Sequence, residues 1–211
     1  MIEKLACNLG RKDEEPNIEL AREIAQAGGK GIAEIVAGLQ GPDKNVSNDC
    51  IKVLYETGKI NPALISPYTD EFIRLLKSRN NRMVWGSMIA LSLIASEAPE
   101  KIFSELPLIM KAYENGSVIT VDYCVSVFAN LAACGPEYEK KVFPIIIKHL
   151  QTCRPKEAAQ HAERAFVSVN KDNAQTFRHV LEKRRDVLSD SQRKRVDKII
   201  KKIENGVFGN R

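Results

Sequence analysis

Apolar side chains recur along the chain at a fixed interval of 37 residues, without insertion or deletion. The clearest columns are Leu39, Leu76, Tyr113 and Leu150; Ile35, Phe72, Ile109 and Ile146; Val36, Ile73, Met110 and Ile147; and Leu54, Leu91, Phe128 and Ala165. Because 44% of the residues are apolar, one column of four is apolar throughout by chance only roughly 4% of the time. Several such columns in one register indicate a stacked array of repeats.

Each unit of 37 residues is predicted to contain two helices. The second helix carries an apolar stripe with spacings of four, three, one and three, which follows one face of a helix with 3.6 residues per turn. In one unit this stripe is Val46, Cys50, Val53, Leu54 and Thr57. Turn residues such as those at 41–43 separate the two helices. A further column, Pro62, Pro99 and Pro136, is expected to begin the segment that follows each second helix.

The two ends of the chain have helical character with a less regular pattern. At the N-terminal end we expect helices over Met1–Leu9 and Pro16–Ala27. At the C-terminal end we expect helices over Gln175–Leu188 and Ser191–Glu204, with the side chains of residues 189–191 available to cap the last helix.

The stripe of the second helices resembles a run found in HEAT and armadillo repeats. In that run a β-branched or apolar residue is followed four positions later by a small residue, then by Ala-Leu and a small closing residue. Here it appears as Met83–Ala95, and again as Val46–Gly58 and Thr120–Ala132. Arg164 departs from it, because the same column holds Val53, Ala90 and Val127 in the other units. A more polar unit near one end of an array fits a capping role.

This resemblance implies an all-α fold, a right-handed α-α superhelix of the ARM/HEAT-like solenoid class with about five helix pairs and a 37-residue repeat. We expect a single domain over residues 1–211. It would comprise an irregular helix pair at 1–29, regular repeats at about 30–170 and a basic helix pair at about 174–204.

Composition is typical of a soluble globular protein, with 28% charged residues. No apolar stretch is long enough to span a bilayer, and the segment Met1-Ile2-Glu3-Lys4 does not look like the start of a secretory signal. A cytoplasmic protein is therefore expected. The five cysteines form no CxxC motif, and their odd number argues against a disulfide framework. We expect Cys50 and Cys124 to be packing residues.

The inner, concave face of a solenoid is lined by the positions of its second helices that do not face the core. The candidate partner-binding residues on this face are Asn48, Lys52, Tyr55, Trp85, Ile89, Asp122, Tyr123 and Ser126. Trp85 is the only tryptophan. It either anchors a partner in the groove or packs against a neighbouring helix. The pattern leaves both interpretations open, because a register error of one residue turns the ring by about 100°.

The net charge of +5 is concentrated near the C-terminal end. Residues 174–211 contain eleven Lys/Arg and five Asp/Glu, whereas the rest of the chain contains 21 and 22. A candidate anion-binding side of the last helix comprises Arg193, Lys194, Lys198, Lys201 and Lys202. Clustered cations neutralise phosphates, but they also form solvated caps of repeat arrays. Nearby acidic residues and the lack of interleaved aromatics, apart from Phe177, favour a solvated cap over a phosphate-binding surface.

No catalytic, metal or cofactor site is expected. His149 and Cys153 are four residues apart, but Leu150 and a turn are expected between them and no third ligand is expected near them. His161 occupies a column of small residues and is expected to be a packing histidine. The glycines at 28–31 lack the preceding strand and the spacing of a phosphate-binding loop. No serine or cysteine has a base and an orienting group at a recognisable spacing.

The leading prediction is a non-enzymatic scaffold or adaptor that binds a protein or peptide partner of unspecified identity on the concave face. The alternative is a nucleic-acid-binding HEAT-like protein. Some bacterial alkylpurine DNA glycosylases are similar in architecture, but they have a strongly basic concave face, whereas the columns here hold Asn48, Asp122 and Glu163. A third option is a module that acts within a larger complex or as a homodimer.

Overall fold

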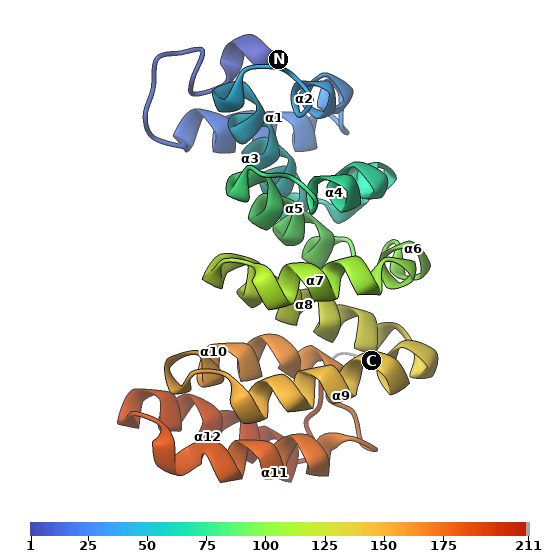
Figure 1. Ribbon diagram of the computed structural model, residues 1–211, viewed down its shortest axis with the longest axis vertical. Coiled ribbons are helices and arrows are strands. Elements are labelled where there is room, and N and C mark those ends of the chain that lie inside the picture. The colour runs from blue at the N-terminus through green and yellow to red at the C-terminus, as the bar shows by residue number, and fades with distance from the viewer. Residues whose placement is uncertain (210–211) are drawn as a thin grey trace. The chain divides into compact units, whose positions relative to one another are not determined.

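The structure of the chain is a computed structural model that describes residues 1–209, and every regular element in this range is a helix (Figure 1). The α-helices are α1 (Glu15–Gln26), α2 (Ile32–Gly38), α3 (Lys44–Ile60), α4 (Thr69–Leu75), α5 (Asn81–Leu93), α6 (Pro99–Ser104), α7 (Leu106–Asn115), α8 (Val118–Cys134), α9 (Pro136–Thr152), α10 (Pro155–Ala165), α11 (Ala174–Arg184) and α12 (Asp190–Glu204). Short 3-10 helices are η1 (Ile2–Lys4), η2 (Pro62–Leu64), η3 (Ser66–Tyr68), η4 (Phe166–Ser168) and η5 (Arg185–Val187).

The second helices of the predicted units are α3, α5, α8 and α10, and their first residues are 37 positions apart in the sequence. Polar residues fix two of these starting points. The side chain of Asp43 accepts a hydrogen bond from the Asn45 backbone N–H at 2.7 Å, and the side chain of Asn80 accepts one from the Arg82 N–H at 3.1 Å. Such N-caps satisfy backbone donors that have no partner inside the helix.

The proline column marks helix starts, as predicted, but it also reveals an element that the two-helix interpretation missed. Pro62 begins η2, Pro99 begins α6 and Pro136 begins α9. In the first two cases a short helix precedes the apolar helix α4 or α7. In the third case the two elements are continuous in α9, which keeps Pro144 in its interior. The units therefore hold up to four helical segments, short 3-10 helices included, rather than two.

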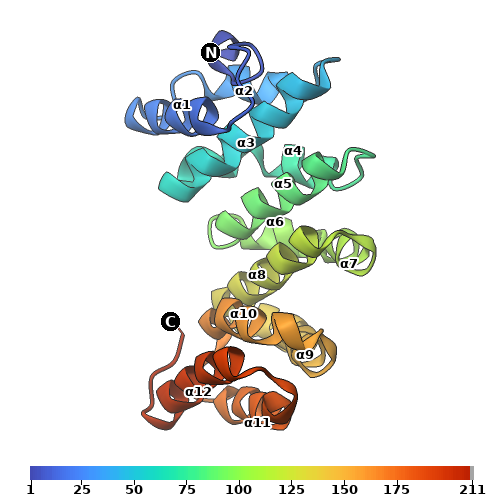
Figure 2. The same ribbon diagram turned by 90° about the vertical axis from the view of Figure 1, so that its left-hand side faces the viewer.

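The chain divides into two compact units, Met1–Cys124 and Val125–Arg211, and the division falls within α8. In the first unit α3 packs against α1, α2 and α5 (Figure 2). The column residues Leu54 and Leu91 are fully buried in this unit, and so are the small residues Cys50 and Ser87. The stripe read from the sequence is thus the face of the second helices that forms the core. A single domain over residues 1–211 stays a prediction.

The predicted helix over Met1–Leu9 is wrong. This segment contains only η1 followed by turns, because side chains from elsewhere take its backbone donors. The Ala6 N–H donates to Asn17 Oδ1 at 3.0 Å, and the Cys7 N–H donates to Asp49 Oδ2 at 2.8 Å. Hydrogen bonds from backbone N–H groups to Asn and Asp side-chain oxygens compete in this way with helical ones.

The second unit contains the helices α9 to α12. Helix α11 packs against α9, and α12 packs against α10 and α11. The rings of Phe143 and Phe177 meet in its core with centroids 6.5 Å apart. The expected cap of the last helix is confirmed, since Ser189 and Gln192 form a reciprocal capping box at the start of α12.

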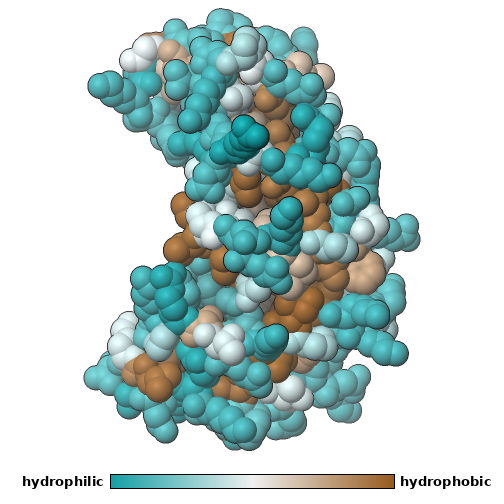
Figure 3. Space-filling model, viewed as in Figure 1, coloured by the Kyte–Doolittle hydropathy of each residue, from teal (hydrophilic) through white to brown (hydrophobic). Residues whose placement is uncertain are grey.

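The surface drawn in Figure 3 carries many hydrophilic side chains, with apolar ones showing between them. Among the large apolar residues that are exposed, Val118 and Ile119 lie at the start of α8. Among residues 1–209, none of the helices combines the length and the apolar composition that crossing a bilayer requires.

Candidate functional site

An aromatic pair links α3 and α5 in the first unit. The rings of Tyr55 and Trp85 have centroids 6.1 Å apart and an interplanar angle of 51°. The Arg82 guanidinium lies 5.4 Å from the centre of the Trp85 ring, within the range of cation–π attraction. Tyr55 is buried, whereas Trp85 is half-buried. The Trp85 ring therefore packs against a neighbouring helix and still presents part of its surface to solvent, which combines the two interpretations left open by the sequence.

Charged side chains surround this pair and are closely paired with one another. Lys52 is only 7% exposed and contacts Glu14 Oε2 and Glu56 Oε1, each at 2.8 Å. Lys59 contacts the same Glu56 oxygen at 2.8 Å, and Arg82 pairs with Glu14. Three cations thus share two carboxylates, and the paired set carries one positive charge in excess. Buried charges are stabilised only by such pairing.

The pKa values of Glu14, Glu56 and Lys52 are shifted in the direction that keeps these three groups charged. Burial alone would raise the pKa of Glu14, but hydrogen bonds from Lys52 and Arg82 outweigh it and the pKa lies below its usual value. The pKa of Glu56 is lowered in the same way, since hydrogen bonds from Lys52 and Lys59 outweigh its burial. For Lys52 the burial effect lowers the pKa, yet its two carboxylate partners raise it above the ordinary lysine value.

A groove of about 500 Å³ lies beside this network, between the N-terminal segment and the start of α3. Glu14, Asn48 and Arg82 all line it. Asn80 Nδ2 donates to Asn48 Oδ1 at 2.8 Å, which fixes the orientation of the Asn48 amide. We call the residues Glu14, Asn48, Lys52, Tyr55, Arg82 and Trp85 the α3–α5 site.

The structure brings together only part of the predicted partner surface. Asn48, Lys52, Tyr55 and Trp85 belong to the α3–α5 site, whereas Ile89 is 5% exposed and offers a partner little surface. Asp122 and Tyr123 are half-buried in the first unit.

Ser126 lies in the second unit, where it accepts a hydrogen bond from Arg164 Nη1 at 2.8 Å. Arg164, the residue that departs from the repeat pattern, is thus engaged with a neighbouring helix of its own unit.

Sequence reasoning missed Glu14, Glu56 and Arg82 as members of the network. Glu56 follows Lys52 by four residues and Arg82 precedes Trp85 by three, so helical spacing alone could have found them. Glu14 directly precedes α1 and lies 38 residues before Lys52 in the sequence, so no local signal connects it with α3.

The predicted anion-binding residues all lie on α12 in the second unit. Lys194, Lys198, Lys201 and Lys202 are exposed. Arg193 is half-buried and donates to the Leu188 carbonyl at 3.2 Å. Neighbouring basic residues are neutralised, in the pairs Arg178–Glu182, Arg185–Asp197 and Arg195–Glu163. The positive charge of this side is therefore carried by its lysines.

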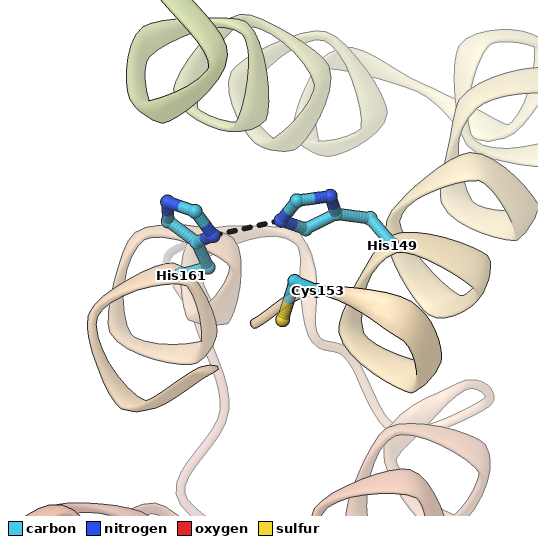
Figure 4. A group of neighbouring side chains, drawn as sticks. All are labelled: His149, Cys153 and His161. Atoms are coloured by element: carbon cyan, nitrogen blue, oxygen red, sulfur yellow. Dashed lines mark hydrogen bonds between the residues drawn. The ribbon is translucent and has the colours of Figure 1, made fainter. Parts of the chain in front are cut away.

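The expectation that His149 and Cys153 have no third ligand near them is wrong. His161 of α10 meets His149 of α9, with His149 Nε2 and His161 Nδ1 2.7 Å apart, and Cys153 lies beside them (Figure 4). The sequence could not show this contact, because it depends on how α9 and α10 pack. The expected burial of His161 is confirmed, since this side chain has no exposed surface.

No family model matches the sequence, and a comparison with curated proteins finds no match. Solved structures do match. A designed armadillo repeat protein, in complex with the peptide (KR)4, is 16% identical, with a TM-score of 0.68 over 89% of this chain and 90% of the other. The fold is an armadillo-like helical repeat.

Two further structures agree with it. An engineered protein is 18% identical with a TM-score of 0.65, covering 100% of this chain and 99% of its own. Computationally designed armadillo repeat proteins for modular peptide recognition are 15% identical with a TM-score of 0.64, over 89% and 91% of the two chains. The predicted all-α, ARM/HEAT-like class is thus confirmed. The identities are low enough that the likeness concerns the armadillo-like fold alone, and the repeat length stays a prediction.

Proposed function

We propose that this armadillo-like chain is a non-enzymatic scaffold or adaptor that binds an extended peptide segment of a partner protein at the α3–α5 site. The observation that supports the proposal most is the state of Trp85, a half-buried indole held by the Tyr55 ring and the Arg82 guanidinium. A rigid aromatic that loses little freedom on binding is the kind of residue that dominates binding energy. Asn48 and Arg82 beside it supply polar groups that can fix the register of a peptide backbone.

The charges of the site indicate the class of peptide. The peptide (KR)4 bound by the designed relative is strongly basic. Here Lys52, Lys59 and Arg82 exceed the acidic groups they contact by one charge. Such a surface repels a basic peptide, so the expected segment is neutral or acidic, with an apolar side chain to cover Trp85.

Lys52, Cys7, Cys50 and Tyr55 are held in their less nucleophilic, protonated forms, which supports a binding role for this part of the first unit rather than catalysis. The raised pKa of Lys52 keeps its amine protonated. Burial raises the pKa of Cys7 to about 11 and that of Cys50 to about 12, so both remain thiols near neutral pH. Burial likewise raises the pKa of the Tyr55 phenol to about 12.

The test is a selection of peptides from a random extended library, followed by affinity measurements on the selected sequences. Since the chain contains one tryptophan, its fluorescence reports directly on contact with Trp85. Trp85→Ala should weaken binding by about 30-fold, which corresponds to a hot spot of about 2 kcal/mol. Val187→Ala, which truncates a residue 57% exposed in the second unit, is the matched control and should leave the affinity unchanged.

Selected peptides that neither change the fluorescence nor distinguish Trp85→Ala from the control would contradict the proposal. Selection of basic peptides that bind at Trp85 would keep the site but overturn the assignment of the peptide class.

A further inference from the structure

Three side chains with metal-binding atoms converge inside the second unit (Figure 4). His149 lies in the last turns of α9, Cys153 follows the end of that helix, and His161 comes from α10. Their ligand atoms all lie within 4.8 Å of one another. We propose that His149, Cys153 and His161 form a buried binding site for one transition-metal ion of borderline to soft character, Zn²⁺ or Cu⁺.

The chemistry of the three groups points to this class of ion. Imidazole nitrogen and thiolate sulfur suit zinc and copper, whereas magnesium, calcium and manganese take oxygen ligands. The three side chains are nearly inaccessible to water, with exposures of 4%, 8% and 0% for His149, Cys153 and His161. Burial excludes competing hydration of the ion, and a Cys thiolate bound to Cu⁺ leaves the site electrically neutral.

The local backbone holds His149 and Cys153 close to one another. The Cys153 N–H donates to the His149 carbonyl at 2.7 Å, which holds the two residues one helical turn apart. Arg184 donates to the carbonyls of Gln151 and Cys153, so the end of α9 is tied to α11. The positions of two ligands are thus set by main-chain contacts that do not depend on a metal.

The corresponding positions in the first unit show what this seam looks like without the cluster. Gly38 and Cys50 lie 111 residues, or three intervals of 37, before His149 and His161. There the helices are so close that a Cβ added to Gly38 would lie 2.5 Å from Cys50 Sγ. In the second unit two imidazoles replace this pair of small residues and face one another. The intervening units pair Leu75 with Ser87 and Ala112 with Cys124 at these positions, so the sequence places two imidazoles opposite one another only at His149 and His161. A shared ligand accounts for this pairing.

Only small movements separate the present arrangement from a coordinated one. Metal–nitrogen bonds of about 2.0 Å and a metal–sulfur bond of about 2.3 Å place tetrahedral ligands about 3.3–3.6 Å apart. The contact of 2.7 Å between the imidazoles would open by about half an ångström, and rotation about the Cα–Cβ bond of Cys153 would bring its sulfur inward. The hydrogen shared by the two rings moves to the outer nitrogen of one of them, and the thiol proton of Cys153 is released to solvent.

The experiment titrates the whole chain with Zn²⁺ and, under anaerobic reducing conditions, with Cu⁺, each against a competing chelator. Co²⁺ replaces Zn²⁺ for spectroscopy. We expect one equivalent of ion per chain and a sulfur-to-cobalt charge-transfer band that reports thiolate coordination. Retention of Zn²⁺ or of Cu⁺ against the chelator supports the proposal and identifies the ion.

Variants locate the site. Cys153→Ser should abolish the charge-transfer band, and His161→Gln should weaken binding by roughly 100-fold or more. Cys134→Ser and His179→Gln alter a second cysteine and an exposed histidine of the same unit, and both should bind like the wild type. Equal binding by all four variants overturns the proposal.

A measurement on the wild-type chain tests the proposal even where a variant fails to fold. X-ray absorption at the edge of the bound metal should show two imidazoles and one sulfur in the first coordination shell. A shell of oxygen atoms, or an ion that the chelator removes completely, overturns the proposal. Neither result bears on peptide binding, because the cluster shares no residue with the α3–α5 site.

Discussion

At the scale of single residues, the α3–α5 site depends on a buried lysine. Lys52 is 7% exposed and keeps its charge only because Glu14 and Glu56 hold it from two sides. An arrangement of this kind fixes the position of Tyr55, whose ring centre lies 5.1 Å from Lys52 Nζ, and through it the position of Trp85. The network therefore orders the aromatic pair more than it adds stability, since replacing buried ion pairs is often neutral.

The network makes stability depend on pH in a predictable direction. The pKa values of Glu14 and Glu56 are lower in the folded chain than their usual value, even though burial opposes the shift, because Lys52 and its neighbours hydrogen-bond to both carboxylates. Their contribution is therefore present above the unfolded pKa of about 4.3 and is lost as the pH falls through the lower folded values. The raised pKa of Lys52 adds a contribution that persists up to the ordinary lysine value and disappears above the folded one.

Lys52→Met removes one shared partner from both carboxylates. In urea denaturation between about pH 6 and pH 3, we expect the unfolding free energy to fall less steeply in this variant than in the wild type. Lys77→Met, at an exposed lysine, is the control and should keep the wild-type slope. Parallel curves for the wild type and Lys52→Met would show that the ion pairs do not shift the two carboxylates.

At the scale of helices, close approach depends on small residues at the end of the stripes of α3, α5 and α8. Gly58 of α3 begins a column that continues with Ala95 and Ala132, both fully buried. A Cβ added to Gly58 would lie 2.3 Å from Ile65 Cδ1 and 3.3 Å from Leu93 Cδ1. Ile65 is itself completely buried, so its side chain has little space to move away.

Gly58→Ala should consequently destabilise the chain. The better helix propensity of alanine gains about 1 kcal/mol, but overpacking costs about 1–3 kcal/mol. A net loss of up to about 2 kcal/mol is expected by urea denaturation. In an Ile65→Val background, which removes the Cδ1 atom, the same substitution should cost less. Gly41→Ala is the control, because the nearest atom to its added Cβ is 3.5 Å away. A stabilised Gly58→Ala chain would mean that α3 and its neighbours are packed less tightly than the structure indicates.

Much of the element arrangement could be predicted from the sequence, because helical periodicity is a local property. The core stripe through Leu54 and Leu91, the proline column and the cap at Ser189 are examples. The segment at Met1–Leu9 was mispredicted, since its backbone partners Asn17 and Asp49 are distant in sequence.

The sites follow the same rule. Residues placed by a single helix could be predicted from the sequence, whereas contacts between helices could not. Trp85 and Tyr55 were identified as candidates from their place on the helix. Glu14 and the contact between His149 and His161 depend on packing between helices, and a single sequence does not specify it.

At the scale of the whole molecule, features with different chemistry belong to different compact units. The α3–α5 site lies within Met1–Cys124, whereas the histidine–cysteine cluster and the basic helix α12 lie within Val125–Arg211. Each feature can therefore be altered by substitutions that leave the residues of the other unit unchanged. This distribution also separates the peptide-binding proposal from the nucleic-acid alternative, which depends on the charge of the second unit.

The charge distribution predicts weak binding to nucleic acid. Exposed lysines of α12, namely Lys194, Lys198, Lys201 and Lys202, stand beside Arg185 and Arg195, whose charges are already neutralised by Asp197 and Glu163. Few cations remain to displace counterions from phosphates, so generic duplex DNA should bind no more tightly than about 100 μM at about 150 mM salt. Fluorescence anisotropy over a salt series measures this, with the four lysines changed to alanine as the control. Micromolar binding with a steep negative salt slope that the lysine variant loses would favour nucleic acid as the partner, because only a face that neutralises several phosphates at once produces such a slope.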